Sequence, residues 1–211
     1  MTKAILYSFR RCPYAMRARM GLYVSGLNYE HREVILRDKP AHMVEVSPKA
    51  TVPVYIRENG EVIEESLDLM LFALAHNDPH NWMVCDTGDA DALITANDGP
   101  FKHNLDRYKY ASRYNEDAAR GDVDLSHRHA AEKHLRALET RLETQPYLLG
   151  ETQKYADIAI FPFIRQFANT DLDWWAQAPY PNLRAWLSRH TESELFQTIM
   201  AKHPQWAPES H

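Results

Sequence analysis

The stretch Tyr7-Ser8-Phe9-Arg10-Arg11-Cys12-Pro13-Tyr14-Ala15 joins a predicted strand to a predicted helix and places a cysteine at the junction. Proline is well tolerated at the first position of a helix, because its missing N–H would have no partner there. Pro13 therefore predicts a helix start, and Cys12 falls at or beside the N-cap. Unpaired N–H groups and the positive end of the helix dipole favour an anion at that position.

This position predicts a thiol that ionises readily. An unperturbed thiol titrates at roughly 8.5, whereas thiols at helix N-termini or near cations fall to about 3.5–7.5. Arg10 and Arg11 directly precede Cys12. We interpret Cys12 as the nucleophile of the protein; the alternative is a buried cysteine that only packs.

The same residues resemble the redox turn of glutaredoxins and thioredoxins, in which a thiol, a proline, an aromatic and a small residue follow a strand. Ala15 stands where the second cysteine of that turn would be. Without an internal resolving thiol, an external thiol must release any mixed disulfide formed at Cys12. We therefore expect monothiol chemistry, with glutathione as the external thiol.

Length, composition and charge exclude several classes of protein. A chain of 211 residues with 45% hydrophobic content can bury one large core or two modest ones. A net charge of −5 gives no general attraction to nucleic acid or to anionic membranes. No signal-peptide pattern and no apolar run long enough to span a membrane is present, and two cysteines make no disulfide framework. We expect a cytosolic protein with a small-molecule partner.

Hydrophobic periodicity predicts the order β-α-β-α-β-β-α over residues 1–76, which is that of a thioredoxin-like domain. Asn59-Gly60 predicts a type I′ turn between the last two strands, and Ser66 is the expected N-cap of the last helix. The edge of the second strand, 29–34, is expected to be exposed. Arg19 falls on the apolar face of the first helix and needs a partner such as Asp68.

Pro53 stands at the start of the predicted strand 51–56. Proline cannot donate to a sheet ladder, so it belongs at a strand start or edge. In thioredoxin-like folds a cis-proline faces the active cysteine. We therefore predict that the Val52–Pro53 bond is cis and that Val52 faces Cys12.

Beyond residue 76 the pattern becomes helical. Turn-forming residues at 77–81 predict a linker, 77–86, followed by an all-helical domain, 87–211. Asn97-Asp98-Gly99-Pro100 predicts a kink in a long helix, and Asp124 or Ser126 opens the next one. Residues 155–170 are apolar nearly all round, which is typical of the central helix of a bundle. The proline-containing end, 204–211, is expected to be loose.

A thioredoxin-like half with Cys-Pro-Tyr-Ala joined to an all-helical half resembles the cytosolic glutathione transferases over the whole chain. The resemblance is greatest to the omega class, which has a cysteine in place of tyrosine or serine, and a bacterial member is expected. It implies an α/β plus all-α fold, with glutathione as co-substrate and no permanently bound cofactor. The residues at the positions that contact glutathione in this family are Lys39, Val52, Pro53, Glu65 and Ser66.

Each of these positions also has a physical rationale. Val52 would offer its backbone N–H and C=O to glutathione as if to an added strand. Ser66 and the helix N-terminus behind it would receive the γ-glutamyl carboxylate, and Glu65 the amino group. In the helical half, Asp157 matches a structural residue of the family, but Lys154 replaces the usual Ser or Thr of its capping box, so the side-chain cap must be missing or rearranged.

Three functions remain open from the sequence. The leading one is a glutathione-dependent thiol transferase or reductase that acts through Cys12. The second is a conjugating transferase that activates the glutathione sulfur, with Tyr7, Ser8 or Tyr14 as the hydrogen-bond donor. The third is a non-catalytic binding protein of the same fold, like the stringent starvation proteins.

A second substrate is expected between the domains. The residues that we expect to line its pocket, or alternatively to belong to the core, are Phe9, Tyr14, Phe101, Arg107, Tyr108 and Trp174. No metal is expected, since His127, His129 and His134 do not share the i, i+4 face that helical ligands need. Cys85 is interpreted as an inert thiol, and a homodimer is expected from the resemblance alone.

Overall fold

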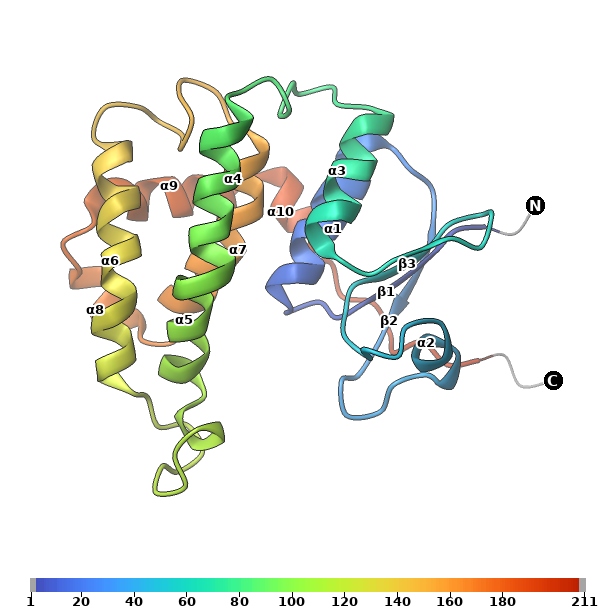
Figure 1. Ribbon diagram of the computed structural model, residues 1–211, viewed down its shortest axis with the longest axis horizontal. Coiled ribbons are helices and arrows are strands. Elements are labelled where there is room, and N and C mark those ends of the chain that lie inside the picture. The colour runs from blue at the N-terminus through green and yellow to red at the C-terminus, as the bar shows by residue number, and fades with distance from the viewer. Residues whose placement is uncertain (1–2, 209–211) are drawn as a thin grey trace. The chain divides into compact units, whose positions relative to one another are not determined.

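The computed structural model describes residues 3–208, which form two compact units (Figure 1). One unit contains the described residues up to Asn81 together with those from Ser193 onward, and the other comprises Trp82–Glu192. The segment after Ser193 therefore belongs to the first unit, whereas we had placed it in the helical domain 87–211.

The first unit is built on a four-stranded mixed sheet with the strand order β2-β1-β3-β4. Strand β1 (Ile5–Ser8) pairs in parallel with β2 (Glu30–Glu33) and antiparallel with β3 (Val54–Ile56), which pairs antiparallel with β4 (Val62–Ile63). The helices of this unit are α1 (Pro13–Ser25), α2 (Ala41–Val46), α3 (Ser66–His76) and α10 (Glu194–Ile199). The thioredoxin-like fold predicted for this part of the chain is confirmed.

Two apolar clusters sandwich this sheet. Strand residues alternate between faces, so Leu6 and Tyr7 of β1 point to opposite sides. Leu6 packs with side chains of α1 and α3, and Tyr7 packs in a second cluster that includes Met43 of α2. The sheet is thus covered on both faces, which holds the end of β1, and the turn that follows it, in place.

The turn between β3 and β4 differs from our prediction. A type I′ turn needs positive φ at both central residues, but Gly60 has a φ of 87° and Asn59 is not among the residues with positive φ. The Gly60 N–H donates to the Arg57 carbonyl, and the Arg57 N–H to the Glu61 carbonyl. This is the three-residue hairpin in which a glycine follows an ordinary turn, so the antiparallel return was predicted correctly and the turn type was wrong.

Helix α3 begins one residue earlier than a Ser66 cap would require. Glu65 occupies the N-cap position, and Ser66 is the first helical residue. The Ser66 hydroxyl accepts a hydrogen bond from the buried Arg17 Nη1 at 3.4 Å. The prediction that Ser66 caps the helix was therefore wrong, because its side chain faces α1 and not the backbone of α3.

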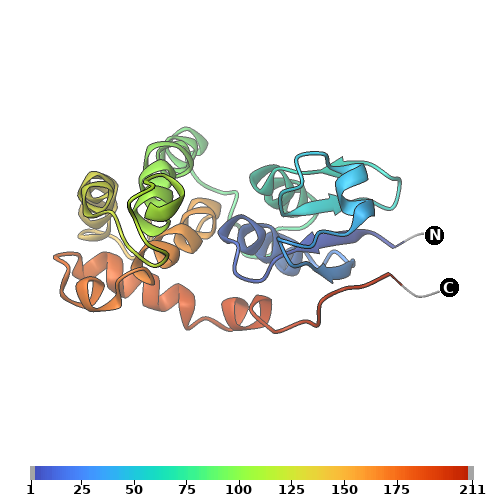
Figure 2. The same ribbon diagram turned by 90° about the horizontal axis from the view of Figure 1, so that it is seen from below.

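The segment that follows α10 lies along β2, where we had predicted an exposed strand edge and a loose chain end. Gln205 forms a parallel bridge with Glu33, and the Trp206 N–H donates to the Glu33 carbonyl at 2.8 Å. The Trp206 ring lies 4.2 Å from the Arg32 guanidinium and packs edge-on against Tyr7. Figure 2 shows this segment in red, running along the first unit. The prediction of a loose end was therefore wrong for Gln205 and Trp206, and the edge of β2 is covered at Glu33. Residues 209–211 lie outside the described residues.

The second unit is helical throughout its regular structure. It contains α4 (Thr87–Ala96), α5 (Lys102–Lys109), α6 (Leu125–Leu142), α7 (Tyr155–Ala168), α8 (Leu172–Gln177) and α9 (Pro181–Thr191). A π-helical turn, Asn97–Phe101, accommodates Pro100 between α4 and α5, at the predicted interruption. Asp124 caps α6, as one of our two alternatives had it. In the described part of the chain, no helix has the length and apolar character needed to cross a membrane.

Asp157 organises the start of α7, the buried central helix. Its carboxylate accepts the Lys154 N–H and the Leu148 N–H, both at 2.9 Å, and the Trp186 Nε1–H at 2.8 Å. A lysine side chain has no acceptor, so the serine or threonine half of the usual capping box is missing and the acidic half is kept. The structural role predicted for Asp157 is confirmed by these contacts.

Two histidines of the helical unit, the buried His190 and the half-buried His134, predict a loss of stability in acid. Burial lowers the pKa of His134 to about 4 and that of His190 to about 3. Both stay neutral in the folded protein below the ordinary value of 6.5, whereas the unfolded chain takes up the protons. The free energy of unfolding is therefore expected to fall as the pH drops below about 6.5, by about 2 kcal/mol per histidine at pH 5.

Urea unfolding between pH 7 and pH 5 measures this effect. His134→Phe keeps a ring against Phe101, on which His134 stacks at 4.7 Å, and removes one titrating group. We expect this variant to lose about 2 kcal/mol less than the wild type over the same pH range. The exposed His129, replaced by Gln, serves as the control and should leave the slope unchanged. Equal slopes for His134→Phe and the wild type would contradict the prediction.

Candidate active site around Cys12

Cys12 lies at the N-terminus of α1, where the sequence placed it. It is the N-cap residue with extended backbone angles, and Pro13 is the first helical residue. The Cys12 N–H donates to the Phe9 carbonyl at 3.0 Å, which closes the turn from β1. The thiol is partly exposed and reduced. Its sulfur therefore combines access to solvent with the N–H groups and the dipole of a 13-residue helix.

The loop before β3 faces this sulfur. The Val52–Pro53 peptide bond is cis, as predicted. The Cys12 Sγ lies 3.8 Å from the Val52 carbonyl oxygen, so Val52 faces Cys12. Apart from this contact, the backbone N–H and C=O of Val52 have no hydrogen-bond partner among residues 3–208. Both groups are left to pair with an extended ligand.

The start of α3 carries the two predicted γ-glutamyl contacts. Ser66 is buried there, whereas the Glu65 side chain is 65% exposed and forms an ion pair with Lys49. Arg17, which is 1% exposed, places its guanidinium against the Ser66 hydroxyl. Lys49 and Arg17 were not among the predicted site residues. Arg17 could have been found from the sequence, because it is an arginine within a largely apolar helix. No local pattern in the sequence indicates Lys49.

Lys39 lies between β2 and α2 and is half-buried. Within the described part of the chain it forms no ion pair or hydrogen bond with another residue. Its ammonium group is thus not committed to a partner inside the protein. A contact between Lys39 and a ligand stays a prediction.

The hydroxyl groups that precede Cys12 are already engaged. Tyr7 and Ser8 are both fully buried. The Tyr7 hydroxyl accepts a hydrogen bond from Arg32 Nη1 at 2.8 Å and lies 2.9 Å from His42 Nδ1, and the Ser8 hydroxyl accepts from Arg19 Nη1 at 2.6 Å. Both hydroxyls are therefore bonded within the protein. Tyr14, the third candidate donor, is half-buried.

Residues 6–82 match the N-terminal domain of glutathione S-transferases and residues 112–189 match the C-terminal domain. The protein belongs to the glutathione S-transferase family. This agrees with the two-part fold described above.

Relatives of this glutathione S-transferase extend over nearly the whole chain. It is 25% identical to glutathione S-transferase U19 of Arabidopsis thaliana, over 91% of this chain and 87% of the relative. It is 27% identical to a probable maleylacetoacetate isomerase of Caenorhabditis elegans, over 99% of this chain and 96% of the relative. The crystal structure of glutathione transferase Omega 3C from Trametes versicolor is similar in fold, with a TM-score of 0.76, 22% identity and coverage of 98% and 93% of the two chains.

The residues predicted to bind a second substrate in this glutathione S-transferase are divided between the units. Phe9 and Tyr14 belong to the first unit. In the second, Phe101 and Tyr108 are fully buried, and their rings pack against Phe167. These two side chains form part of the core of the helical unit, which was our alternative interpretation.

The other two candidates also contact their own unit. Trp174 packs edge-on against Phe167 and lies 4.7 Å from the Arg128 guanidinium. Arg107 stacks over Tyr114 at 4.4 Å. A second-substrate pocket built from these residues stays a prediction.

Cys85 differs from Cys12 in its surroundings. Burial raises the pKa of the Cys85 thiol above its ordinary value. The group is therefore protonated at neutral pH, which agrees with our interpretation of Cys85 as unreactive.

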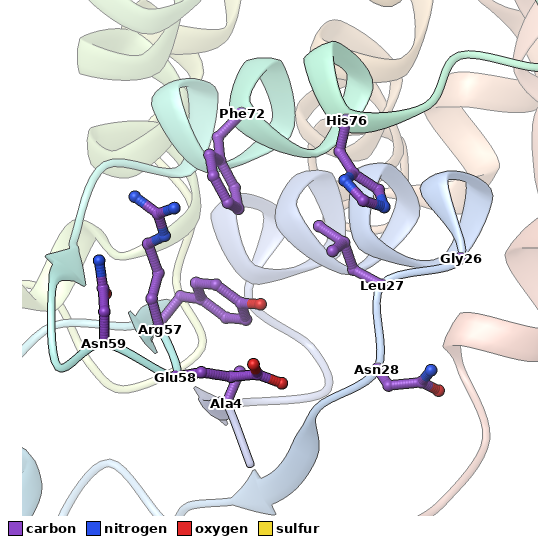
Figure 3. Close-up of a pocket in the computed structure, with 10 residues that line it drawn as sticks. Ala4, Gly26, Leu27, Asn28, Arg57, Glu58, Asn59, Phe72 and His76 are labelled. Atoms are coloured by element: carbon purple, nitrogen blue, oxygen red, sulfur yellow. The ribbon is translucent and has the colours of Figure 1, made fainter. Parts of the chain in front are cut away.

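A pocket of ≈ 550 Å³ in the first unit lies away from Cys12 (Figure 3). Ala4, before β1, and Arg57, after β3, line it together with Phe72 and His76 of α3. Cys12 and Val52 lie beyond the opposite ends of these two strands. The pocket therefore opens at the other end of the sheet and contains none of the predicted glutathione contacts.

Proposed function

We propose that this member of the glutathione S-transferase family is a glutathione-dependent thiol transferase whose nucleophile is Cys12. The observation that carries the proposal is the partly exposed sulfur at the start of α1, 3.8 Å from the Val52 carbonyl, beside a cis-proline. The complete burial of Tyr7 and Ser8, whose hydroxyls accept hydrogen bonds from Arg32 and Arg19, supports it, because neither side chain is exposed to the sulfur of a bound glutathione.

The reaction has two exchange steps. The Cys12 thiolate attacks the glutathione sulfur of a glutathionyl disulfide, forming a Cys12–glutathione disulfide and releasing the substrate thiolate, which takes up a proton from water. A second glutathione, as thiolate, then attacks the glutathionyl sulfur. It forms oxidised glutathione and restores the Cys12 thiolate. Over the two steps, one glutathione thiol is consumed, the substrate sulfur is reduced to a thiol, and the glutathionyl group of the substrate leaves as half of oxidised glutathione, with no other electron donor.

The glutathione site that we propose runs from Val52 to the start of α3. The backbone N–H and C=O of Val52 pair with the peptide of glutathione, and the Ser66 region of the α3 N-terminus receives its γ-glutamyl carboxylate. The Glu65 carboxylate receives the γ-glutamyl amino group of glutathione. This amino group must compete with the Lys49 ammonium group, which pairs with Glu65 in the protein. Lys39 contributes a further positive charge at the edge of the site.

Replacing Glu65 and Ser66 together by alanine tests this site. We expect the affinity for glutathione, measured by isothermal titration calorimetry, to fall at least about tenfold, because at least two charge-assisted hydrogen bonds are removed. Glu58→Ala is the matched control, since Glu58 lies in the hairpin at the other end of the sheet. An unchanged affinity in the folded double variant would move the glutathione site elsewhere.

Conjugation of glutathione to electrophiles is the second candidate function. It is favoured by the relatives named glutathione S-transferase, and Tyr14 is one of its predicted donors. Two assays on the wild type separate the functions: reduction of a small glutathionyl disulfide, and conjugation to a chloronitrobenzene. Reduction as the main activity supports our proposal, conjugation alone supports the second, and neither activity with no glutathione binding supports a binding protein. A homodimer in the cytosol stays a prediction from the resemblance.

A further inference from the structure

The backbone N–H and C=O of Arg10, two residues before Cys12, are each hydrogen-bonded to a charged side chain. The Glu33 carboxylate accepts the Arg10 N–H at 2.6 Å. The Arg19 guanidinium donates to the Arg10 carbonyl at 2.7 Å through Nη2. The backbone between β1 and α1 is thus fixed by one anion from β2 and one cation from α1.

Arg19 also contacts the two preceding residues of the same turn. Its Nη1 donates to the Ser8 hydroxyl at 2.6 Å and lies 3.4 Å from the Phe9 carbonyl. That carbonyl is the acceptor of the Cys12 N–H. One guanidinium therefore touches three consecutive residues, and the second of them bonds directly to the nucleophile.

Within the described chain, Arg19 is a buried cation without a carboxylate in direct contact. The side chain is 3% exposed, and no carboxylate oxygen of residues 3–208 lies within 4.0 Å of its nitrogens. Burial lowers its pKa to about 10, and the negative charge of Glu33 is the main influence that opposes this. Arg19 therefore stays positively charged at neutral pH, and its two terminal nitrogens donate to the residues between β1 and Cys12.

Both charged residues are also held by the C-terminal segment, 199–206. Arg19 Nε donates to the Ile199 carbonyl at 3.0 Å, and its Nη2 lies 3.9 Å from the Met200 sulfur. The backbone of Glu33 accepts the Trp206 N–H, and its carboxylate lies 3.0 Å from His31, whose ring stacks on His203. The segment thus contacts Arg19, Glu33 and a neighbour of Glu33.

We propose that Arg19 and Glu33 are positioning residues for Cys12, which orient its thiolate by clamping the backbone N–H and C=O of Arg10, and that residues 199–206 hold this clamp in place. The inference rests on the proposed role of Cys12 as the nucleophile. Neither side chain touches the substrate in this proposal; both act through the turn between Ser8 and Cys12.

Alkylation of Cys12 by iodoacetamide tests the clamp without depending on enzymatic activity. The thiolate displaces iodide and forms a thioether, and the rate is followed by mass spectrometry of the Cys12 peptide in a Cys85→Ser background. In Arg19→Met we expect this rate at about pH 6.5 to fall about tenfold or more, and reduction of the disulfide substrate to fall through kcat. Glutathione affinity should stay within about twofold, since Arg19 contacts none of the proposed glutathione residues.

Conservative variants distinguish a positioning role from a contribution to folding alone. Arg19→Lys keeps the charge but not the planar fork that reaches several acceptors, so it should restore part of the rate. Glu33→Gln keeps an acceptor for the Arg10 N–H without the charge and should lower the rate about threefold. If Arg19→Met does not fold, these two variants carry the test. The exposed Arg120, replaced by Met, is the control.

The outcomes separate the clamp from the proposed function. Wild-type alkylation rates and pH profiles in folded Arg19→Met, Arg19→Lys and Glu33→Gln would overturn the clamp. A Cys12→Ala variant that still reduces the disulfide would instead overturn the role of Cys12 as nucleophile, whatever the alkylation rates are. Slower alkylation that tracks a lower urea midpoint in every variant would show that the two residues only stabilise the fold.

Discussion

Replacing Cys12 by alanine is expected to bring glutathione-dependent disulfide reduction down to the uncatalysed background. The covalent intermediate needs a sulfur at the start of α1. Cys85, the other free cysteine among the described residues, does not belong to this turn and so cannot replace Cys12. Glutathione binding should persist, because the backbone of Val52 and the start of α3 are unchanged. The measurement is the steady-state rate with a small glutathionyl disulfide, alongside calorimetry of glutathione binding.

The rate of glutathione conjugation in Cys12→Ala should not fall together with the rate of reduction. Without Cys12, bound glutathione cannot form a disulfide with the protein, so its own sulfur is free to face an electrophile. We expect conjugation to a chloronitrobenzene to be maintained or to rise. Cys85→Ala is the matched control and should leave both activities unchanged, since its thiol is protonated at neutral pH. Reduction that survives Cys12→Ala would remove the basis of the proposed mechanism.

Replacing Asp157 by alanine is expected to cause the largest loss of stability. The carboxylate is fully buried and accepts three N–H groups, two from the backbone and one from Trp186. Alanine leaves these donors buried without an acceptor, and each such group costs about 1–3 kcal/mol. We expect the free energy of unfolding to fall by about 3–5 kcal/mol.

Urea unfolding at pH 7 measures this change. Asp157→Asn keeps one acceptor oxygen and should lose less than the alanine variant. Asp117→Ala removes an exposed carboxylate from a loop of the same unit and should stay within about 0.5 kcal/mol of the wild type. A loss below about 1 kcal/mol in Asp157→Ala would show that water replaces the carboxylate at the start of α7.

The local features of the site could be predicted from the sequence because they depend on neighbouring residues. Pro13 determines where α1 begins, and a proline at a strand start points to the loop that faces Cys12. Residues that act over long distances in the chain were missed or misassigned. Arg19 was given a carboxylate partner such as Asp68, but its acceptors are carbonyl groups of residues 9, 10 and 199 and the Ser8 hydroxyl.

The docking of Trp206 was missed for a related reason. A single aromatic residue among prolines and polar residues has no periodicity, so composition predicts a loose end. Its position depends on Arg32 and Tyr7, which lie far from it in the sequence. The prediction of the turn type at Asn59-Gly60 was wrong for another reason. This dipeptide is compatible with two hairpin geometries, and the sequence does not select between them.

The division of the first unit between both ends of the chain has a consequence for protein synthesis. A ribosome releases the residues up to Asn81 long before it makes Ser193 and the segment that follows. N-terminal domains generally fold first during translation. Here the contacts of Ile199 with Arg19 and of Trp206 with Glu33 cannot form while only the N-terminal part of the first unit has been made. They form only after more than one hundred further residues (82–192) have emerged from the ribosome. The turn that carries Cys12, the proposed nucleophile, would then be among the last parts of the molecule to reach its final structure.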